Sequence, residues 1–254
     1  MYKLKNKASY CIFLLLISPF LVNAQQSAGS FRNYYTGLRD DSLKFQLDLI
    51  IDPEQVEGTM KIPSTGESLH IEGSLSAQEG AITLHALNEK DSVKKTLYCR
   101  IGPFSSNING TWLDASDTKL RKFRIKKVAE YLILRQETGF IKAQASIPQF
   151  LKPMAPWQQL NLWINDTNSE IINNFVLRKE DQLVLNKTNI FLGWQYQVNY
   201  IVSYYSEDFL SLLIRKDEYS ISDKPDVSFS TSNIELRDNT FQNIKLSDLF
   251  LEGT

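Results

Sequence analysis

The stretch Trp194-Gln195-Tyr196-Gln197-Val198-Asn199-Tyr200-Ile201-Val202-Ser203-Tyr204-Tyr205 alternates large apolar or aromatic side chains with mostly polar ones. A period of two sustained over this length predicts a long β-strand with one buried face, and aromatic and β-branched residues suit such a face. Large rings that share one face need a sizeable partner surface, and we expect a helix packed across a sheet. The rings on that face are Trp194, Tyr196, Tyr200 and Tyr204.

The N-terminal half carries a series of shorter alternating segments. Strands are predicted to start near residues 43, 56, 69, 81, 95, 108 and 120, with turn signals between them. Regular short strands without a helical period are typical of an antiparallel meander, and closure of a meander removes its exposed edges. We therefore predict a β-rich fold in which residues 25–128 form an antiparallel β meander, as a curved sheet or a barrel.

After residue 128 the pattern changes, and an α+β domain is predicted for residues 129–254. Apolar residues at helical spacing predict a helix over residues 157–176. Thr167, with Glu170 three residues later, has the spacing of a capping box and leaves open a second helix that starts there. We expect the helix to pack on an antiparallel sheet. The strand-like runs around it are residues 131–135, 140–147, 209–221, 226–237 and 241–250.

Residues 1–24 have the composition of a secretory signal peptide. Lysines precede an apolar run over residues 11–22, and the small residue Ala24 suits signal peptidase. The run is short for a membrane span, so we expect cleavage before Gln25 and export to the periplasm or the cell exterior. A retained N-terminal anchor is the alternative. No other segment is apolar enough to cross a membrane, so no transmembrane segment is predicted after signal cleavage.

Composition limits the partners of the mature chain. Without the lysines of the signal peptide it has 25 basic and 29 acidic side chains, a formal charge near -4, which gives no reason to expect nucleic acid. Cys99 is the cysteine that remains, so no internal disulfide is expected despite export. Because Cys99 alternates with Leu97 and Ile101 on an apolar face, a buried thiol is expected in place of a nucleophile.

Ser92 and Lys95 have the bare spacing of a serine–lysine acylation motif, but that motif needs a helix start and they fall in a turn between predicted strands. None of the other motifs of catalytic, phosphate-binding or metal sites is found in the sequence. His70 and His85 fall on the polar faces of their strands, where pairing of the strands could bring them to a metal ion together with Glu72. Solvated side chains are the favoured interpretation, and neither a metal nor a cofactor is predicted. A pair of carboxylates for glycoside hydrolysis stays open, because any two acidic residues can meet in space.

Candidates for a binding surface are a basic run and a few rings. The run KLRKFRIKK places Lys122, Arg124 and Lys126 on one strand face, which suits an anionic envelope polymer or an acidic protein. A solubilising edge strand is the simpler interpretation of this run. Rings of the central strand are expected in the core. The candidates for exposed rings that stack on sugars are Trp112, Trp157 and Tyr205.

Several segments within residues 140–250 resemble one family in their order and spacing. They are Ser146-Ile147-Pro148-Gln149-Phe150, Leu162-Trp163-Ile164-Asn165, Tyr196-Gln197-Val198-Asn199-Tyr200, Phe209-Leu210-Ser211-Leu212 and Ile244-Lys245-Leu246-Ser247-Asp248-Leu249-Phe250. They are similar to the extracellular domain of unknown function found in a lysozyme-sensing anti-sigma factor and beside the catalytic domain of a peptidoglycan deacetylase.

Two departures from that family stand out. Its usual Gly-Gly-Ala-His segment is replaced here by Ser220-Ile221-Ser222-Asp223-Lys224-Pro225. The family domain also continues beyond the closing segment, so we expect this chain to be either a shortened form or a fragment. The resemblance implies binding or sensing at the cell envelope without catalysis, and it implies peptidoglycan or a lysozyme-like protein as partner.

Together these features predict an exported, non-enzymatic protein of a bacterial cell envelope that binds a glycan or an envelope-acting protein. Two alternatives of other classes stay open. One is a hydrolase of envelope polysaccharide whose carboxylate pair is assembled in three dimensions. The other is a lipocalin-like carrier in which the N-terminal meander encloses a small apolar ligand.

Overall fold

The computed structural model describes residues 30–53, 55–76, 81–101, 105–185, 193–220, 224, 226–237 and 239–244. The predicted signal peptide lies outside these residues. The elements in chain order are β1 (Phe31–Arg39), β2 (Leu43–Ile51), β3 (Gln55–Ile62), β4 (Glu67–Ser76), β5 (Ala81–Leu87), β6 (Val93–Arg100), β7 (Asn107–Asp114), β8 (Arg121–Thr138), β9 (Ile141–Phe150), α1 (Ala155–Leu185), β10 (Trp194–Tyr205), β11 (Phe209–Ser220), β12 (Asp226–Arg237) and β13 (Thr240–Ile244).

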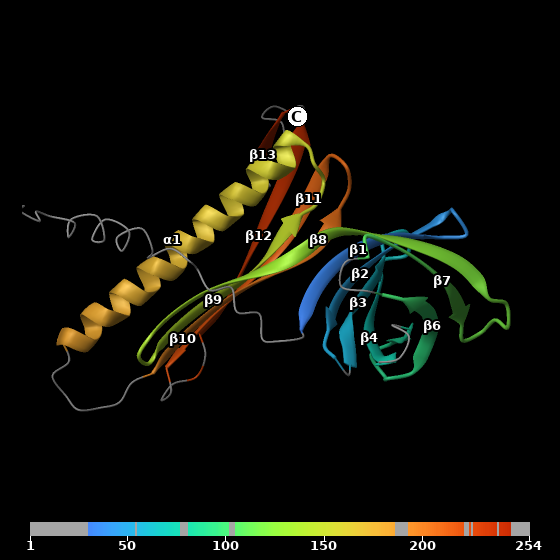
Figure 1. Ribbon diagram of the computed structural model, residues 1–254, viewed down its shortest axis with the longest axis horizontal. Helices are drawn as coiled ribbons and strands as arrows, with labels where there is room; N and C mark the ends of the chain where they lie inside the picture. The colour runs from blue at the N-terminus through green and yellow to red at the C-terminus, as the bar shows by residue number, and fades with distance from the viewer. Residues whose placement is uncertain are drawn as a thin grey trace, which may run out of the picture.

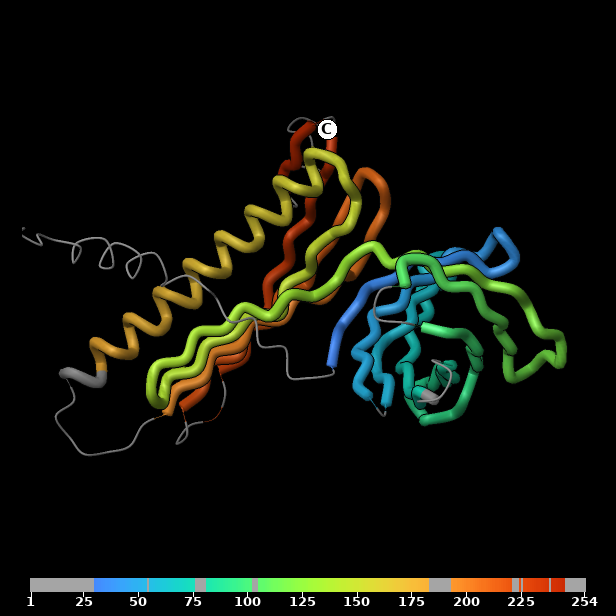
Figure 2. The backbone as a smooth tube through the Cα atoms, in the orientation of Figure 1, coloured from blue at the N-terminus to red at the C-terminus, as the bar shows by residue number. Residues whose placement is uncertain are grey.

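Strands β1 to β8 form an antiparallel barrel at one end of the molecule (Figures 1 and 2). Each strand pairs with the next, and β1 closes the ring by pairing residues 33–39 with residues 123–130 of β8. The predicted antiparallel meander is confirmed, in its barrel form. Strands β2 to β8 begin within two residues of the predicted starts. Strand β1 was not predicted, because the buried Asn33 interrupts its apolar alternation.

The side chains that point into the barrel fill it. The ring of Phe45 meets those of Trp112 and Phe123 edge-on, with centroids 5.1 and 5.9 Å apart. The expectation that Trp112 is exposed is wrong: its exposed fraction is 0%, because it lies on the inward side of β7 with Ile108. Cys99 is buried, as predicted, and burial raises the pKa of its thiol to about 12. An eight-stranded barrel is just wide enough for side chains to occupy its interior.

Strand β8 belongs to both halves of the molecule. Residues 121–126 pair with β7, and residues 129–138 pair with β9. Between these two parts, Lys127, Val128 and Ala129 are buried one after another, so the in-and-out alternation stops where the strand changes partners. The boundary predicted at residue 129 falls at this point.

The second half is a sheet of β8 to β13 in chain order, covered on one face by α1 (Figure 1). Its neighbouring strands are antiparallel apart from β9 and β10, which pair in parallel over residues 141–146 and 194–199. A parallel pair needs a crossover connection, and α1 supplies it. The predicted helix on an antiparallel sheet is confirmed with this one exception. Strands β10 and β12 have the predicted bounds, whereas residues 245–250 lie outside the described residues.

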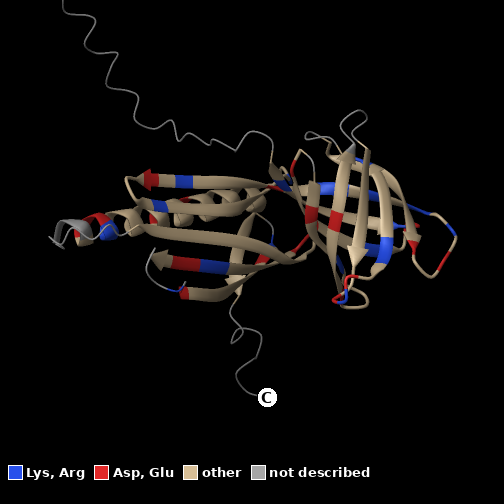
Figure 3. Cartoon of the chain, turned by 90° about the horizontal axis from the view of Figure 1, so that it is seen from below, with Lys and Arg blue, Asp and Glu red and all other residues tan. Residues whose placement is uncertain are grey.

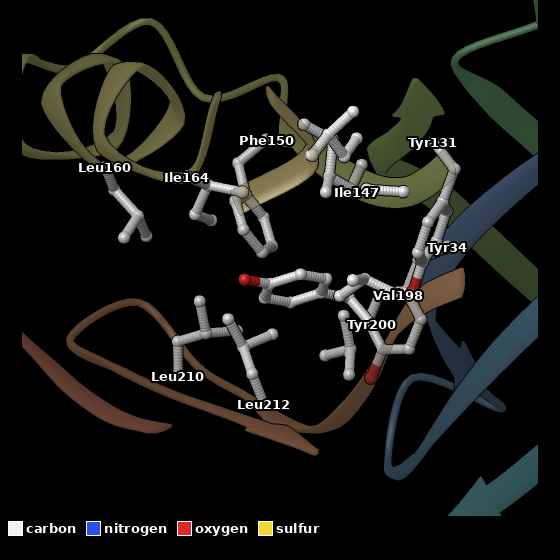
Figure 4. Packing of buried hydrophobic residues seen from close by; sticks show 14 of the residues in the cluster. Tyr34, Tyr131, Ile147, Phe150, Leu160, Ile164, Val198, Tyr200, Leu210 and Leu212 are labelled. Carbon is white, nitrogen blue, oxygen red and sulfur yellow. The ribbon is translucent and has the colours of Figure 1, made fainter. Parts of the chain in front are cut away.

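Helix α1 is continuous over 31 residues, so the second helix considered at Thr167 is wrong. The apolar stripe that packs on the sheet continues past this position, through the buried Ile172 and Phe175. Trp157, expected to be exposed, is buried against Phe150, with ring centroids 4.9 Å apart. No helix in the described part of the chain is long and apolar enough to span a membrane. Figure 4 shows side chains from the helix and the strands converging on one core: Ile147, Phe150, Leu160, Ile164, Val198, Tyr200, Leu210 and Leu212.

Candidate functional site

A groove of about 770 Å³ lies between the outer wall of the barrel and the connection from β10 to β11. We call it the turn groove. Strands β1, β2, β7 and β8 form its wall, and residues 204–207 form the opposite side. The side chains that give it chemical character are Lys44, Asn107, Asn109, Arg124, Lys126 and Tyr204.

Strand pairing arranges side chains of the wall, most of them polar, in two rows that cross the strands. Leu38 of β1 lies opposite Lys44 on one side and Arg124 on the other, and Arg124 is itself opposite Asn109. The second row crosses the same strands. It consists of Gln46, Thr36, Lys126 and Asn107. Neighbouring strands are about 4.8 Å apart, so each row spans about 14 Å of surface.

The cations of β8 point outward because β8 alternates as the sequence predicts. Lys122, Arg124 and Lys126 are exposed, and Phe123 and Ile125 between them are buried in the barrel. The edge-strand interpretation of this run is wrong, since β8 pairs with β1 on one side and β7 on the other. The run therefore lies on a continuous wall and not at an open edge.

The cations of the groove are only weakly compensated. Arg124 Nη2 lies 3.0 Å from Asp41 Oδ1, but both side chains are largely exposed, and such surface pairs contribute little. Among the residues that the structure describes, Lys44 and Lys126 form no ion pair. Of the described residues that line the groove, Glu207 is the one carboxylate. The groove is therefore locally basic, although acidic and basic positions are interspersed on the strands of both halves (Figure 3).

An irregularity in β10 decides which tyrosine faces solvent. The register between β10 and β11 shifts between Val202 and Tyr204. Beyond this shift Tyr205 turns to the core, where its ring lies 5.2 Å from that of Trp157, and burial raises the pKa of Tyr205 to about 12. Tyr204, predicted in the core, is 43% exposed instead. The exposed ring of the groove is thus Tyr204, and Tyr205 is a half-buried part of its wall.

The structure brings together some of the predicted binding residues. Tyr205, Arg124 and Lys126 line the turn groove. Lys122 shares the outer face of β8 but does not line the groove, and Trp112 lies inside the barrel. Sequence reasoning missed the remaining groove residues, because they come from strands that only closure of the barrel makes neighbours. The outward parity of Lys44 in β2 was the one available signal for them.

The histidines lie on the outer surface of the barrel. Strands β4 and β5 pair, as a shared metal site would require, and Glu72 lies opposite His85. His70 Nε2 is 3.4 Å from Glu72 Oε1, with both side chains more than half exposed. Within the described residues, no group of three or more His, Cys, Asp or Glu side chains could hold a metal ion.

Comparison with protein-family models and with curated proteins gives no match to this chain. The groove combines two rows that carry cations and amides, on the paired strands of the barrel, with an exposed aromatic ring across from them.

Proposed function

We propose that this protein is exported to the cell envelope, binds an anionic glycan in the turn groove, and has no catalytic activity of its own. The single observation that carries this proposal is the placement of three cations and three amides on the barrel wall opposite the exposed ring of Tyr204. Cations attract carboxylate or phosphate groups, amides bond to hydroxyls, and an aromatic face stacks on the apolar face of a sugar.

The dimensions of the wall suit a polymer better than a small molecule. Each row is about 14 Å long, four strands wide at the usual strand spacing, which exceeds one sugar ring. The wall is also preorganised, because its side chains stand on paired strands of a closed barrel. A chain of sugars laid across β1, β2, β7 and β8 would meet both rows.

Support for export comes from the composition of residues 1–24, and support for an envelope ligand comes from the family resemblance of residues 140–250. The hydrolase alternative gains nothing from the groove, since glycoside hydrolysis needs two carboxylates and Glu207 is the one carboxylate among the described residues that line it. The carrier alternative needs an empty apolar interior, whereas Phe45, Trp112 and Phe123 occupy the interior of the barrel.

The test is co-sedimentation of the mature chain, from Gln25 onward, with insoluble peptidoglycan. We expect the chain to sediment and the double variant Lys44→Gln/Lys126→Gln to bind about tenfold more weakly, since two lost charge contacts of moderate strength amount to about 1.4 kcal/mol. Binding of the wild type should weaken as salt screens the exposed cations. Lys122→Gln is the matched control, because Lys122 is also exposed on β8 but lies outside the groove.

Three results would overturn the proposal. Failure of the wild type to sediment would exclude peptidoglycan and direct the search to an acidic protein such as a lysozyme-like partner. An equal loss in the Lys122 control would exclude the groove as the site. Soluble fragments released from the peptidoglycan would contradict the non-catalytic part and require a search for a carboxylate pair.

A further inference from the structure

A second, smaller cavity lies at the junction of the two halves. It has a volume of about 150 Å³ and lies between the outer wall of β1 to β3 and residues 201–202 of β10. We call it the junction pocket. It is separate from the turn groove, with which it shares only the side chain of Gln46. The outward-facing residues of three neighbouring barrel strands form its base, and Ile201 and Val202 cover it.

One side chain of the pocket has an unsatisfied polar group. Tyr34 is 1% exposed, and its hydroxyl has no hydrogen-bond partner among the residues that the structure describes. A buried hydroxyl without a partner is costly and rare in folded proteins. Tyr34 points from β1 toward the second sheet, where it lies beside Tyr131 (Figure 4). Burial raises the phenol pKa well above its ordinary value, so the group stays protonated and can donate a hydrogen bond.

The charges around the pocket do not cancel. Arg32 and Asp48 compensate each other through two hydrogen bonds of 2.8 and 2.7 Å. Arg32 also lies over the ring of Tyr131, 3.9 Å from its centroid, and the Tyr131 hydroxyl donates to Asp48 Oδ2 at 3.4 Å. The carboxylate of Asp48 is therefore already engaged within the protein.

Lys61 supplies the remaining charge. Its ammonium donates to the Val202 carbonyl oxygen at 3.4 Å, a long contact, and no carboxylate in the described part of the chain forms an ion pair with it. Burial lowers the pKa of Lys61, and the negative charge of Asp48 partly offsets this effect. The pocket thus has one cation that its own residues leave uncompensated.

We propose that the junction pocket binds a small monocarboxylate. The ammonium of Lys61 and the hydroxyl of Tyr34 donate to the carboxylate oxygens, and the apolar side chains of Ile50, Ile201 and Val202 contact a short carbon chain. A cavity of about 150 Å³ holds a ligand the size of benzene, so an acid of about six heavy atoms fits and a polymer does not. One uncompensated positive charge matches one carboxylate and not a dianion.

The test is isothermal titration of the mature chain with lactate, with lactamide as a neutral ligand of the same shape and sulfate as a dianion. We expect saturable binding of lactate and at least about tenfold weaker binding of the other two, the usual loss when a charge-assisted hydrogen bond is removed. Tyr34→Phe removes only the hydroxyl, and Lys61→Met keeps the aliphatic chain. Each should weaken lactate binding at least about tenfold.

Lys94→Met is the control, since Lys94 is exposed on β6 and lines neither cavity. A far-ultraviolet spectrum and a melting curve of each variant establish that it is folded. Absence of saturable lactate binding would mean that the pocket holds only water, and would overturn the proposal. Equal affinity for lactate and lactamide, or unchanged affinity in Tyr34→Phe, would overturn it too. Sedimentation with peptidoglycan is a separate measurement, so either proposal can fail without the other.

Discussion

At the scale of single residues, Asn161 joins the helix to the sheet. Strand β10 pairs with β9 only over residues 141–146, so the edge of β9 is free at Phe150. The side-chain amide of Asn161 occupies this edge: its oxygen accepts from the Phe150 amide at 2.9 Å, and its nitrogen donates to the Phe150 carbonyl oxygen at 2.9 Å. One asparagine thereby satisfies both backbone groups of a buried residue, as a neighbouring strand would.

Replacing Asn161 with alanine should therefore destabilise the fold more than its position on a helix suggests. Asn161→Ala leaves two backbone groups of Phe150 without partners, and we expect a loss of about 2 kcal/mol in the free energy of unfolding. Urea denaturation followed by tryptophan fluorescence measures it. The control is Leu162→Ala, which truncates a side chain that is 61% exposed on the same helix and should cost less than about 0.5 kcal/mol. Equal losses in the two variants would contradict the role of Asn161.

At the scale of elements, helix α1 is continuous at a position where the local sequence has the signal for a helix start. The spacing of Thr167 and Glu170 is that of a capping box, but α1 runs through both. In a helix interior alanine is favoured over threonine, so we expect Thr167→Ala to leave stability unchanged or to raise it by a few tenths of a kcal/mol. Loss of an N-cap would instead cost about 1 kcal/mol. Thermal unfolding distinguishes these outcomes, and a loss of that size would show that the helix is interrupted in solution.

Strands with strong alternation could be predicted from the sequence. Which side chains of different strands meet in the folded molecule could not. Strand β10 has the predicted bounds because its alternation is a local feature of the sequence. Strand β1 was missed because Asn33 is buried, paired through its side chain with the Tyr35 hydroxyl at 3.1 Å. The exposed cations of β8 were predicted by parity, but the turn groove was not, since Tyr204 joins them only through the irregularity in β10. Nothing in the sequence indicates that the Tyr34 hydroxyl is buried without a hydrogen-bond partner among the described residues.

At the scale of the whole molecule, a shared strand and a group of side-chain contacts connect the barrel to the second sheet. Strand β8 runs through both, and the contacts around Asp48 connect their surfaces, with Arg32 on β1 and Tyr131 on β8. Further hydrogen bonds cross the junction from Gln46 to the Tyr205 carbonyl oxygen and from Lys61 to the Val202 carbonyl oxygen. The groove and the pocket both lie along this junction, so each of the proposed ligands would contact residues of both halves.

Tyr35, buried in the barrel, and Tyr205, half-buried at the junction, make the stability of the fold sensitive to alkaline pH. Burial raises the pKa of Tyr35 in the barrel and of Tyr205 at the junction to about 12, from 10.0. As pH rises above the lower value, the unfolded chain loses these protons while the folded chain keeps them. The stability contributed by the protonated phenols is thus complete below about pH 10 and is lost as pH approaches the folded pKa of about 12.

We therefore expect the urea midpoint to fall steeply between about pH 10 and pH 12, with Tyr35 alone responsible for about 3 kcal/mol at the upper end. Tyr35→Phe removes this titration and should flatten the fall, although it also removes the hydrogen bond from Asn33 and lowers stability at neutral pH. Tyr98→Phe, at a ring that is 43% exposed, should leave the profile unchanged. A midpoint that does not vary over this range would mean that the unfolded chain keeps its phenols as protected as the folded one does, which would contradict the burial of Tyr35 as the source of its raised pKa.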